Sequence, residues 1–202
     1  KKQSITSDEL VIEAPLQINI NSESYTVVMR TPGNDQDLVL GLLYAEDIYK
    51  DSLPVPFEII EEKFNIPSIV NVTIAPNILG NGYLNKRTLL SVSSCGICGK
   101  QQLEDIKVSG DKIEQKIYFS PENLLNMFAP LKKEQETFKK TGGSHAAGIY
   151  NHQYKLLTSR EDIGRHNAVD KCVGSLLQKQ LLKSGMYLLV SGRVSYEIVS
   201  KA

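Results

Sequence analysis

The first part of the chain alternates apolar and polar positions in a way that predicts paired β-strands. Leu16 and Ile18 stand two residues apart, and a turn-rich stretch at residues 19–24 separates them from the β-branched run at 25–29. A period of two is typical of a strand with one buried face. Similar runs predict further strands over residues 57–75, 87–93 and 112–119.

A helical repeat follows the loop at residues 31–35. Between Asp37 and Tyr49 the leucines are so frequent that most of the surface of a helix would be apolar. The spacing therefore predicts a largely buried helix over residues 37–49. The loop before it ends in Asn34 and Asp35, which are residue types that commonly begin helices.

The pattern changes at residue 120. Ser120 is a suitable N-cap and Pro121 fits the first helical position, which predicts a helix over 121–138 that Pro130 interrupts. A strand–helix–strand order after it suggests a parallel pair of strands with a right-handed crossover. The predicted order is strand, strand, helix, strand and helix, at residues 144–150, 153–159, 166–180, 186–191 and from 195 onward.

These patterns predict an α/β protein in two parts. Residues 1–115 are expected to form an α+β N-terminal domain, and residues 116–202 a second domain built of α/β layers. A chain of 202 residues is long enough for one sizeable core or for two small domains.

Charge and composition narrow the class of protein. Lys plus Arg and Asp plus Glu both number 23, so the net charge does not indicate nucleic acid as a partner. No apolar run approaches the ~20 residues of a membrane helix, and no apolar segment typical of a signal peptide follows Lys1. Three cysteines, one far from the other two, do not make a disulfide framework. We therefore expect a cytoplasmic protein with no membrane partner.

Cys95 and Cys98 are the strongest candidates for chemistry. Gly96 and Gly99 leave the two thiols little side-chain cover, and Lys100 opens a run that can begin a helix. Thiolates form where backbone N–H groups, a helix N-terminus or a cation favour the charge. The spacing alone leaves three alternatives open: half of a zinc site, a redox or sulfur-carrying pair, and a pair without a chemical role.

The third cysteine, Cys172, falls on the predicted helix 166–180. It lies near the apolar positions Val169 and Leu176 on that helix. A small buried hydrophobe is the better interpretation of a cysteine in such a position.

A glycine pair stands before the predicted strand 144–150. Gly142 and Gly143 permit a tight turn or a close approach of the backbone to a ligand. Small residues around His145 would let its ring face a pocket. Taken alone, the segment is better explained as a turn that opens a buried strand, with His145 hydrogen-bonded in the core.

Residues 160–171 lie between a predicted strand and a predicted helix, where open α/β sheets bind their ligands. Gly164 supplies the turn, Arg165 and His166 supply cations, and the N-terminus of the helix suits an anion. The density of functional side chains favours a site over a solvated, salt-bridged loop. Residues 191–193, Ser-Gly-Arg, have the same position before the last helix, so both segments could share one crevice.

Five segments together resemble the formate dehydrogenase accessory sulfurtransferase family, FdhD. They lie, in order, at residues 29–41, 94–99, 141–147, 161–171 and 191–193. Each motif is weak alone, but five in the same order are highly specific. The resemblance extends from about residue 10 to the last residue.

The resemblance implies a function that composition does not show. Members of this family take sulfur from a cysteine desulfurase and pass it to the molybdenum or tungsten bis-pterin guanine dinucleotide cofactor, before that cofactor enters formate dehydrogenase. The carrier is a cysteine persulfide, which corresponds to Cys95, with Cys98 beside it. The second part of the family is similar to a cytidine-deaminase-like fold, a three-layer α/β arrangement.

The expected partners are therefore a cysteine desulfurase, formate dehydrogenase and a second copy of the chain. Cationic side chains and helix N-termini are the natural partners of the two pyrophosphates of such a cofactor. No protein metal ligand is expected. The expected cofactor-binding residues are Gly142, Gly143, His145, Gly164, Arg165, His166, Asn167, Ser191, Gly192 and Arg193.

The alternatives to a sulfur carrier are a zinc deaminase and a non-catalytic chaperone. Zinc deaminases carry His-x-Glu followed by Pro-Cys-x-x-Cys, whereas here His145 is followed by two alanines and a serine precedes Cys95. The other alternative is a non-catalytic chaperone that binds the cofactor, with Cys95 and Cys98 in a structural zinc site. Family members continue beyond the position of Ala202 with a further strand and a cofactor-binding segment, so the resemblance leaves C-terminal truncation open.

Overall fold

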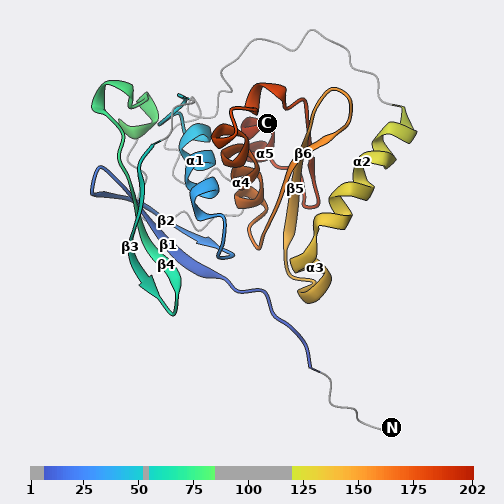
Figure 1. Ribbon diagram of the computed structural model, residues 1–202, viewed down its shortest axis with the longest axis horizontal. Helices are drawn as coiled ribbons and strands as arrows, with labels where there is room; N and C mark the ends of the chain where they lie inside the picture. Colours follow the sequence, from blue (N-terminus) through green and yellow to red (C-terminus); the bar gives the residue numbers. More distant parts are fainter. Residues whose placement is uncertain (1–6, 52–54, 85–119) are drawn as a thin grey trace.

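A computed structural model of the chain describes residues 7–51, 55–84 and 120–202 (Figure 1). It contains a four-stranded sheet of order β2-β1-β4-β3 and a three-stranded sheet of order β6-β5-β7. The strands are β1 (Ala14–Ile20), β2 (Glu23–Arg30), β3 (Phe57–Lys63), β4 (Ile66–Val72), β5 (His145–Tyr150), β6 (Leu156–Asp162) and β7 (Tyr187–Val190). The α-helices are α1 (Asp35–Ala45), α2 (Pro121–Glu134), α3 (Glu136–Thr141), α4 (Arg165–Gln178) and α5 (Tyr196–Lys201), with short 3-10 turns at Pro76–Ile78, Asn81–Leu84 and Leu182–Ser184.

The four-stranded sheet confirms the alternation near the start of the chain. β1 and β2 form an antiparallel hairpin in which Leu16 stands opposite Val28. The turn between them uses Asn21 and Ser22, both with a positive φ. β4 then pairs with β1 in parallel and with β3 in a second hairpin. The predicted strands at 87–93 and 112–119 lie outside the described residues.

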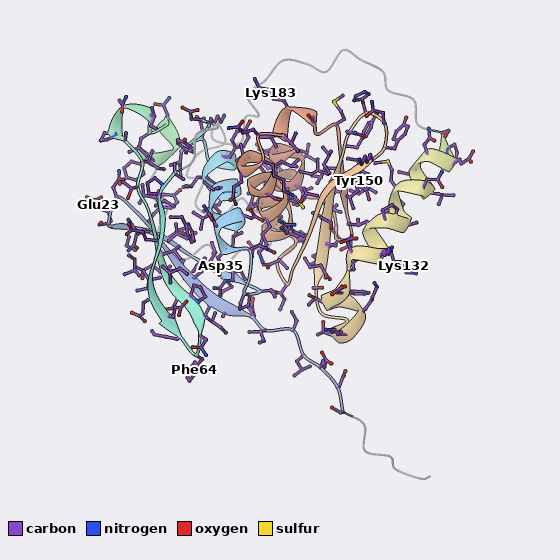
Figure 2. The ribbon with its side chains drawn as sticks, viewed as in Figure 1. Glu23, Asp35, Phe64, Lys132, Tyr150 and Lys183 are labelled. Atoms are coloured by element: carbon purple, nitrogen blue, oxygen red, sulfur yellow. The ribbon has the colours of Figure 1, made fainter. Side chains whose placement is uncertain are left out.

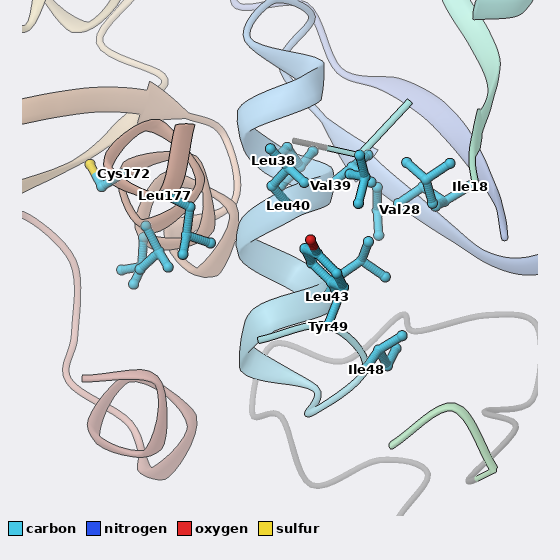
Figure 3. Packing of buried hydrophobic residues seen from close by; sticks show 14 of the residues in the cluster. Ile18, Val28, Leu38, Val39, Leu40, Leu43, Ile48, Tyr49, Cys172 and Leu177 are labelled. Atoms are coloured by element: carbon cyan, nitrogen blue, oxygen red, sulfur yellow. The ribbon is translucent and has the colours of Figure 1, made fainter. Parts of the chain in front are cut away.

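Two helices lie between the sheets. Figure 1 shows α1 and α4 side by side, with the four-stranded sheet on one flank and β5 and β6 on the other. α1 begins two residues before the predicted start and ends four residues before the predicted end. Figure 3 shows Leu38 and Leu43 of α1 packed near Ile18 and Val28, while Cys172 lies on the far side of α4.

One hydrophobic cluster joins both parts of the chain. It runs from Leu16 and Leu38 in the first part to Leu176 in the second, and all three side chains are fully buried. The α/β fold class is confirmed. The predicted domain boundary at residue 115 lies outside the described residues and stays a prediction.

The helices α1 and α4 approach each other at two glycines. A Cβ atom on Gly41 would lie 1.9 Å from the carbonyl oxygen of Asp170, and one on Gly174 would lie 1.8 Å from that of Asp37. Real Cβ contacts are never this short, so any side chain at these positions pushes the helix backbones apart. Glycine is required here by proximity and not by backbone torsion, since both residues are helical.

We expect Gly41→Ala to lower the free energy of unfolding by about 1–3 kcal/mol because it overpacks the helix crossing. Alanine is intrinsically better in a helix than glycine by roughly 0.5–1 kcal/mol, so a loss would identify the crossing as its cause. Urea denaturation measures the effect. Gly143→Ala is the control, because its Cβ would meet chiefly a methyl group of the Val11 side chain and not the backbone of another helix. A stabilised Gly41→Ala protein would contradict the close packing.

The three-stranded sheet corrects one prediction. β6 and β7 run in the same direction, but they are not neighbours, because β5 lies between them and pairs antiparallel with both. The predicted parallel pair is therefore wrong. A hairpin first places β6 on one edge of β5, and the crossover through α4 then brings β7 to the edge that remains.

The helix after residue 120 also differs from its prediction. Ser120 caps it as expected, with its hydroxyl accepting from the N–H of Asn123 at 3.1 Å, but α2 continues through Pro130 to Glu134 and the break comes at Gln135. Proline removes one backbone hydrogen bond. Packing holds the helix together around that gap, because Met127 and Leu131 are buried against the sheet on either side of the proline.

Tyr150 joins α2 to the sheet. Its side chain lies on the α2 side of β5, and its hydroxyl donates to the carbonyl of Met127 at 2.6 Å (Figure 2). α2 and α4 therefore cover opposite faces of the three-stranded sheet. These two helices leave the ends of its strands uncovered.

Candidate functional site

Strand direction brings three of the predicted segments to one edge of the three-stranded sheet. β5 starts at His145, which pairs with Asp162 at the end of β6. Ala147 pairs with Val190, the last residue of β7. Because β5 is antiparallel to both neighbours, its start meets their ends. We call the predicted site residues at this end of the sheet the strand-end cluster. Its members are Gly142, Gly143, His145, Gly164, Arg165, His166, Asn167, Ser191, Gly192 and Arg193.

The turns of the cluster contact one another directly. Ser191 donates its N–H to the carbonyl of Ala146 at 2.9 Å, and its hydroxyl accepts from the Ala146 N–H at 2.8 Å. A Cβ on Gly192 would lie 3.2 Å from both the Cβ of Arg165 and Nδ1 of His145. The two segments that the sequence placed in one crevice are therefore adjacent, and His145 lies close to Gly192.

His166 occupies the centre of a hydrogen-bonded group. Its Nε2 lies 3.1 Å from the hydroxyl of Ser195, and its Nδ1 lies 3.3 Å from a carboxylate oxygen of Glu197. Burial lowers the pKa of His166 to about 4, with the charges of Arg165 and Lys201 adding to the effect. The ring is thus neutral near pH 7. Because a carboxylate only accepts, the tautomer with its proton on Nδ1 suits the approach of Glu197, and Nε2 then accepts from the Ser195 hydroxyl.

This geometry changes the role expected of His166. It does not supply a cation to an anionic ligand, because it is neutral and both ring nitrogens have partners within the protein. Sequence reasoning missed Ser195 and Glu197 as its partners. The available signal was local: Ser195 is a helix N-cap and Glu197 lies in the first turn of α5.

Acid should weaken the fold through His166. The pKa falls from an ordinary 6.5 to about 4 on folding, so the unfolded chain takes the proton first as the pH drops. The stability from neutral His166 is fully present above pH 6.5 and is lost as the pH falls from 6.5 toward 4. Relative to His166→Gln, we expect the wild type to lose up to about 1.4 kcal/mol of unfolding free energy per pH unit in this window.

Denaturant titrations of both proteins between pH 4 and 6.5 measure this difference. Burial raises the pKa of Asp170 to about 6, which gives a dependence of opposite sign. Asp170 is present in both proteins, so its contribution cancels in the comparison. Parallel pH profiles would show that His166 is not a buried neutral imidazole.

Asp162 holds the loop between β6 and α4 in place. The side chain is 0% exposed and its two oxygens accept from four donors. One oxygen binds the N–H of Gly164 at 2.8 Å and Nδ2 of Asn167 at 3.0 Å, and the other binds Nζ of Lys171 at 2.7 Å and the N–H of Thr31 at 3.1 Å. A loop of the first part of the chain is thereby tied to the start of α4.

Gly164 and Asn167 belong to this scaffold. Asn167 also donates to the carbonyl of Met29 at 2.8 Å. A Cβ on Gly164 would lie 2.8 Å from Nδ2 of Asn167, while its φ of −90° is open to any residue. Gly164 does lie in the bend between β6 and α4, as expected, but glycine is needed there because its missing Cβ leaves room for the Asn167 amide.

The glycine pair before β5 shapes the entry to that strand. Gly142 ends α3 in the left-handed conformation, with a φ of 65°. Glu161 fixes the surrounding turn, because its carboxylate accepts from the backbone N–H groups of Thr137 and Phe138 and from the hydroxyl of Ser144. These contacts support the interpretation as a turn that opens a buried strand.

Arg193 is the cation of the cluster that is open to solvent. It is exposed and has no hydrogen bond or ion pair to the residues that the structure describes. Arg165 beside it is half-buried at the first position of α4. A helix N-terminus and a guanidinium together favour an anion.

Cys172 is the cysteine that the structure describes. Cys172 is 0% exposed, its thiol donates to the carbonyl of Ala147 at 3.2 Å, and burial raises its pKa to about 12. It is the small buried hydrophobe predicted, with almost no thiolate near pH 7. Cys95 and Cys98 lie outside the described residues.

Residues 7–51, 55–84 and 120–202 contain neither a group of side chains that could hold a metal ion nor a membrane-spanning helix. No three His, Cys, Asp or Glu side chains there converge in a way that could hold a metal ion. None of the helices in those ranges is both long and apolar enough to cross a membrane.

Comparison with known proteins agrees with the arrangement of the motifs. The sequence profile of the FdhD/NarQ family matches residues 11–202. A sulfur carrier protein FdhD of Sulfolobus acidocaldarius is 39% identical over 198 residues, which is 98% of this chain and 74% of that protein. The protein of the same name from Streptomyces avermitilis is 36% identical over 98% of this chain and 74% of its own length.

A solved structure is similar in fold. It is the crystal structure of a protein from Desulfotalea psychrophila described as a formate dehydrogenase accessory protein. The TM-score is 0.68 at 20% sequence identity, with 96% of this chain and 70% of the other covered. On the extent of the sequence match and the identity to these relatives, the chain belongs to the FdhD/NarQ family.

Proposed function

We propose that this protein carries sulfur as a persulfide on Cys95. The observation that supports the assignment is the environment of Cys172, which is fully buried and has a pKa raised to about 12. Sulfur transfer requires a thiolate that a donor can reach. Cys95 and Cys98 are the remaining candidates among the three cysteines, and the relatives are named sulfur carriers.

Loading is a thiol exchange on a cysteine desulfurase. The Cys95 thiolate attacks the terminal sulfur of a persulfide on that enzyme. The sulfur–sulfur bond of the donor breaks, and its cysteine leaves as a thiolate. Cys95 then holds the transferred sulfur, and no electron is gained or lost overall.

Cys98 has a role in delivery. If the terminal sulfur leaves as sulfide, it needs two electrons. Attack of the Cys98 thiolate on the sulfur of Cys95 supplies them: a Cys95–Cys98 disulfide forms and the terminal sulfur departs with the electron pair. A reductant of the thiol class then restores the pair.

The substrate of delivery is the molybdenum or tungsten bis-pterin guanine dinucleotide, before its insertion into formate dehydrogenase. Its pyrophosphates fit the strand-end cluster, where Arg193 is exposed and Arg165 begins α4. Because Gly192 has no Cβ, its backbone can lie close to the imidazole of His145. His166, Asn167, Ser191 and the glycines at 142, 143 and 164 set the shape of the turns.

Mass spectrometry tests the assignment. The purified chain is incubated with a cysteine desulfurase and cysteine, and the peptide containing Cys95 is examined for one added sulfur atom. We expect the added sulfur on Cys95 and none on Cys172. A chain that never gains sulfur and holds one zinc ion per molecule would instead establish the chaperone with a structural zinc site.

A further inference from the structure

The two hairpins of the four-stranded sheet have the same kind of turn but different residues in it. Each turn has two residues with a positive φ: Asn21 and Ser22 between β1 and β2, and Phe64 and Asn65 between β3 and β4. Such turns need the left-handed backbone at both positions, which asparagine and glycine adopt most easily. Asn21 follows this rule. Phe64, with a φ of 54°, does not, because a bulky side chain is disfavoured in this conformation.

Phe64 gains nothing from packing that would offset this strain. It is 97% exposed, and Figure 2 shows it at the tip of the β3–β4 hairpin, away from the body of the protein. Leaving an aromatic ring in water is itself unfavourable. A residue that is both strained and exposed, with no compensating contact, is more typical of a functional site than of a scaffold.

The strand that leads to this tip carries a net negative charge. β3 contains one lysine and three glutamates, Glu58, Glu61 and Glu62. The ammonium of Lys63 pairs with the carboxylate of Glu61 at 3.1 Å, whereas Glu58 and Glu62 are exposed. A partner that binds next to β3 is therefore expected to present cations to it.

β3 is the outer strand of its sheet, so a partner could either add a strand to it or bind the tip. Ile59 and Ile60 are 50% and 55% exposed on this strand. However, the pairing of β3 with β4 shifts register between Ile59 and Glu61 and again before Glu62. Bulges and charges of this kind protect an edge strand from pairing with another chain. The tip with Phe64 is therefore the better contact for a partner.

Two neighbouring residues connect this hairpin to the strand-end cluster. The guanidinium of Arg30 donates to the carbonyl of Pro67, three residues after Phe64, at 2.8 Å. The next residue, Thr31, donates its N–H to Asp162 at 3.1 Å, and Asp162 holds the loop that leads into α4. Figure 1 shows the tip of the hairpin at the same end of the molecule as α3 and the start of β5. A protein bound at the tip therefore lies at the end of the molecule that carries the strand-end cluster.

We propose that the β3–β4 hairpin docks the protein that accepts the cofactor from this chain, with the ring of Phe64 inserted into an apolar pocket that cations surround. The choice of partner rests on the proposed function, since the acceptor must reach a ligand held at the strand-end cluster. Aromatic side chains in the centre of an interface often contribute most of its binding energy. A second copy of the chain fits less well, because a symmetric contact through the tips would bring two acidic strands together.

Calorimetric titration of the full chain with formate dehydrogenase that lacks its cofactor tests this contact through Phe64→Asn. Loss of the ring should weaken binding about tenfold or more. Asparagine suits the left-handed backbone, as Asn21 does in the other hairpin, so the melting temperature of the free chain should rise by roughly 2–4 °C. Leu125→Asn is the matched control, because Leu125 is 69% exposed on α2, far from the hairpin; it should leave the Kd unchanged.

The charge of β3 is tested in the same titration. Glu62→Gln should weaken binding of the cofactor-free enzyme roughly threefold at low salt and less at high salt, as expected of an exposed charge. Glu122→Gln removes the same charge from the first turn of α2, on the other side of the molecule (Figure 1). This control variant should bind as the wild type does at both salt concentrations.

Two results would overturn the proposal: failure of the wild type to bind the cofactor-free enzyme, and equal affinity of the wild type and Phe64→Asn for it. If the affinity is equal but Phe64→Asn changes the oligomeric state, the tip is a contact between two copies of the chain. If the affinity is equal but Cys95 is loaded more slowly by the desulfurase, the tip binds the sulfur donor. Sulfur loading of wild-type Cys95 does not involve the acceptor, so that measurement tests the proposed function separately.

Discussion

Cells whose only copy of this protein carries Cys95→Ala are expected to have no active formate dehydrogenase. The substitution removes the atom that holds the transferred sulfur, and the Cys98 thiol that remains is assigned to delivery and not to loading. Formate oxidation in extracts of such cells is the measurement. Unchanged thermal unfolding of the purified variant would show that the loss is chemical.

Cys172→Ala is the matched control for this loss. It removes a thiol of the same kind from the core, where the pKa near 12 keeps it protonated. We expect it to cost about 1 kcal/mol of stability and to leave formate dehydrogenase activity intact. Cys98→Ala should retain partial activity if Cys98 assists delivery only. Full activity with Cys95→Ala would refute the persulfide assignment.

Asp162→Ala is expected to lower the free energy of unfolding by about 3–5 kcal/mol, because it leaves the ammonium of Lys171 buried without its counter-ion. Lys171 has a side chain only 2% exposed, and its other partner among the described residues is the carbonyl of Thr31 at 2.8 Å. The variant also deprives the N–H groups of Thr31 and Gly164 of their acceptor. Denaturant titration near neutral pH measures the loss.

A second variant separates charge from packing. Asp162→Ala combined with Lys171→Met removes both charges, and replacing a buried ion pair by apolar groups is often close to neutral. The double variant should therefore recover a large part of the stability that Asp162→Ala loses. Glu61→Ala, which breaks an exposed pair with Lys63, should leave the denaturation midpoint unchanged. A loss below about 1 kcal/mol for Asp162→Ala would mean that this pair is hydrated.

The local part of the fold was predictable because its causes are local. Alternation over residues 9–30 and 57–75 led to the two hairpins of the first sheet, since a strand with one buried face must repeat every two residues. Ser120 and Pro121 marked the start of α2 for reasons confined to one helical turn. The apolar spacing of the helix around Cys172 correctly predicted a buried thiol.

Motif order in the sequence was enough to identify the family, and it grouped the residues of the strand-end cluster before any of their contacts were known. What each of them does was decided by tertiary structure. His166 was taken for a cation, and burial beside Arg165 makes it neutral. Gly164 was correctly placed in the turn before α4, but only the assembled structure shows that glycine leaves the space there for the Asn167 amide.

Sheet order and the close crossing of α1 and α4 depended on the assembled molecule. β5 lies between β6 and β7 because the crossover through α4 brings β7 to the free edge of β5 and not to that of β6. Gly41 and Gly174 stand at a helix contact between segments 133 residues apart, and no local pattern records which backbone will meet a given glycine. Periodicity and capping act within a few residues and can be read along the chain, whereas desolvation, ion pairing and strand adjacency arise only when distant segments pack together.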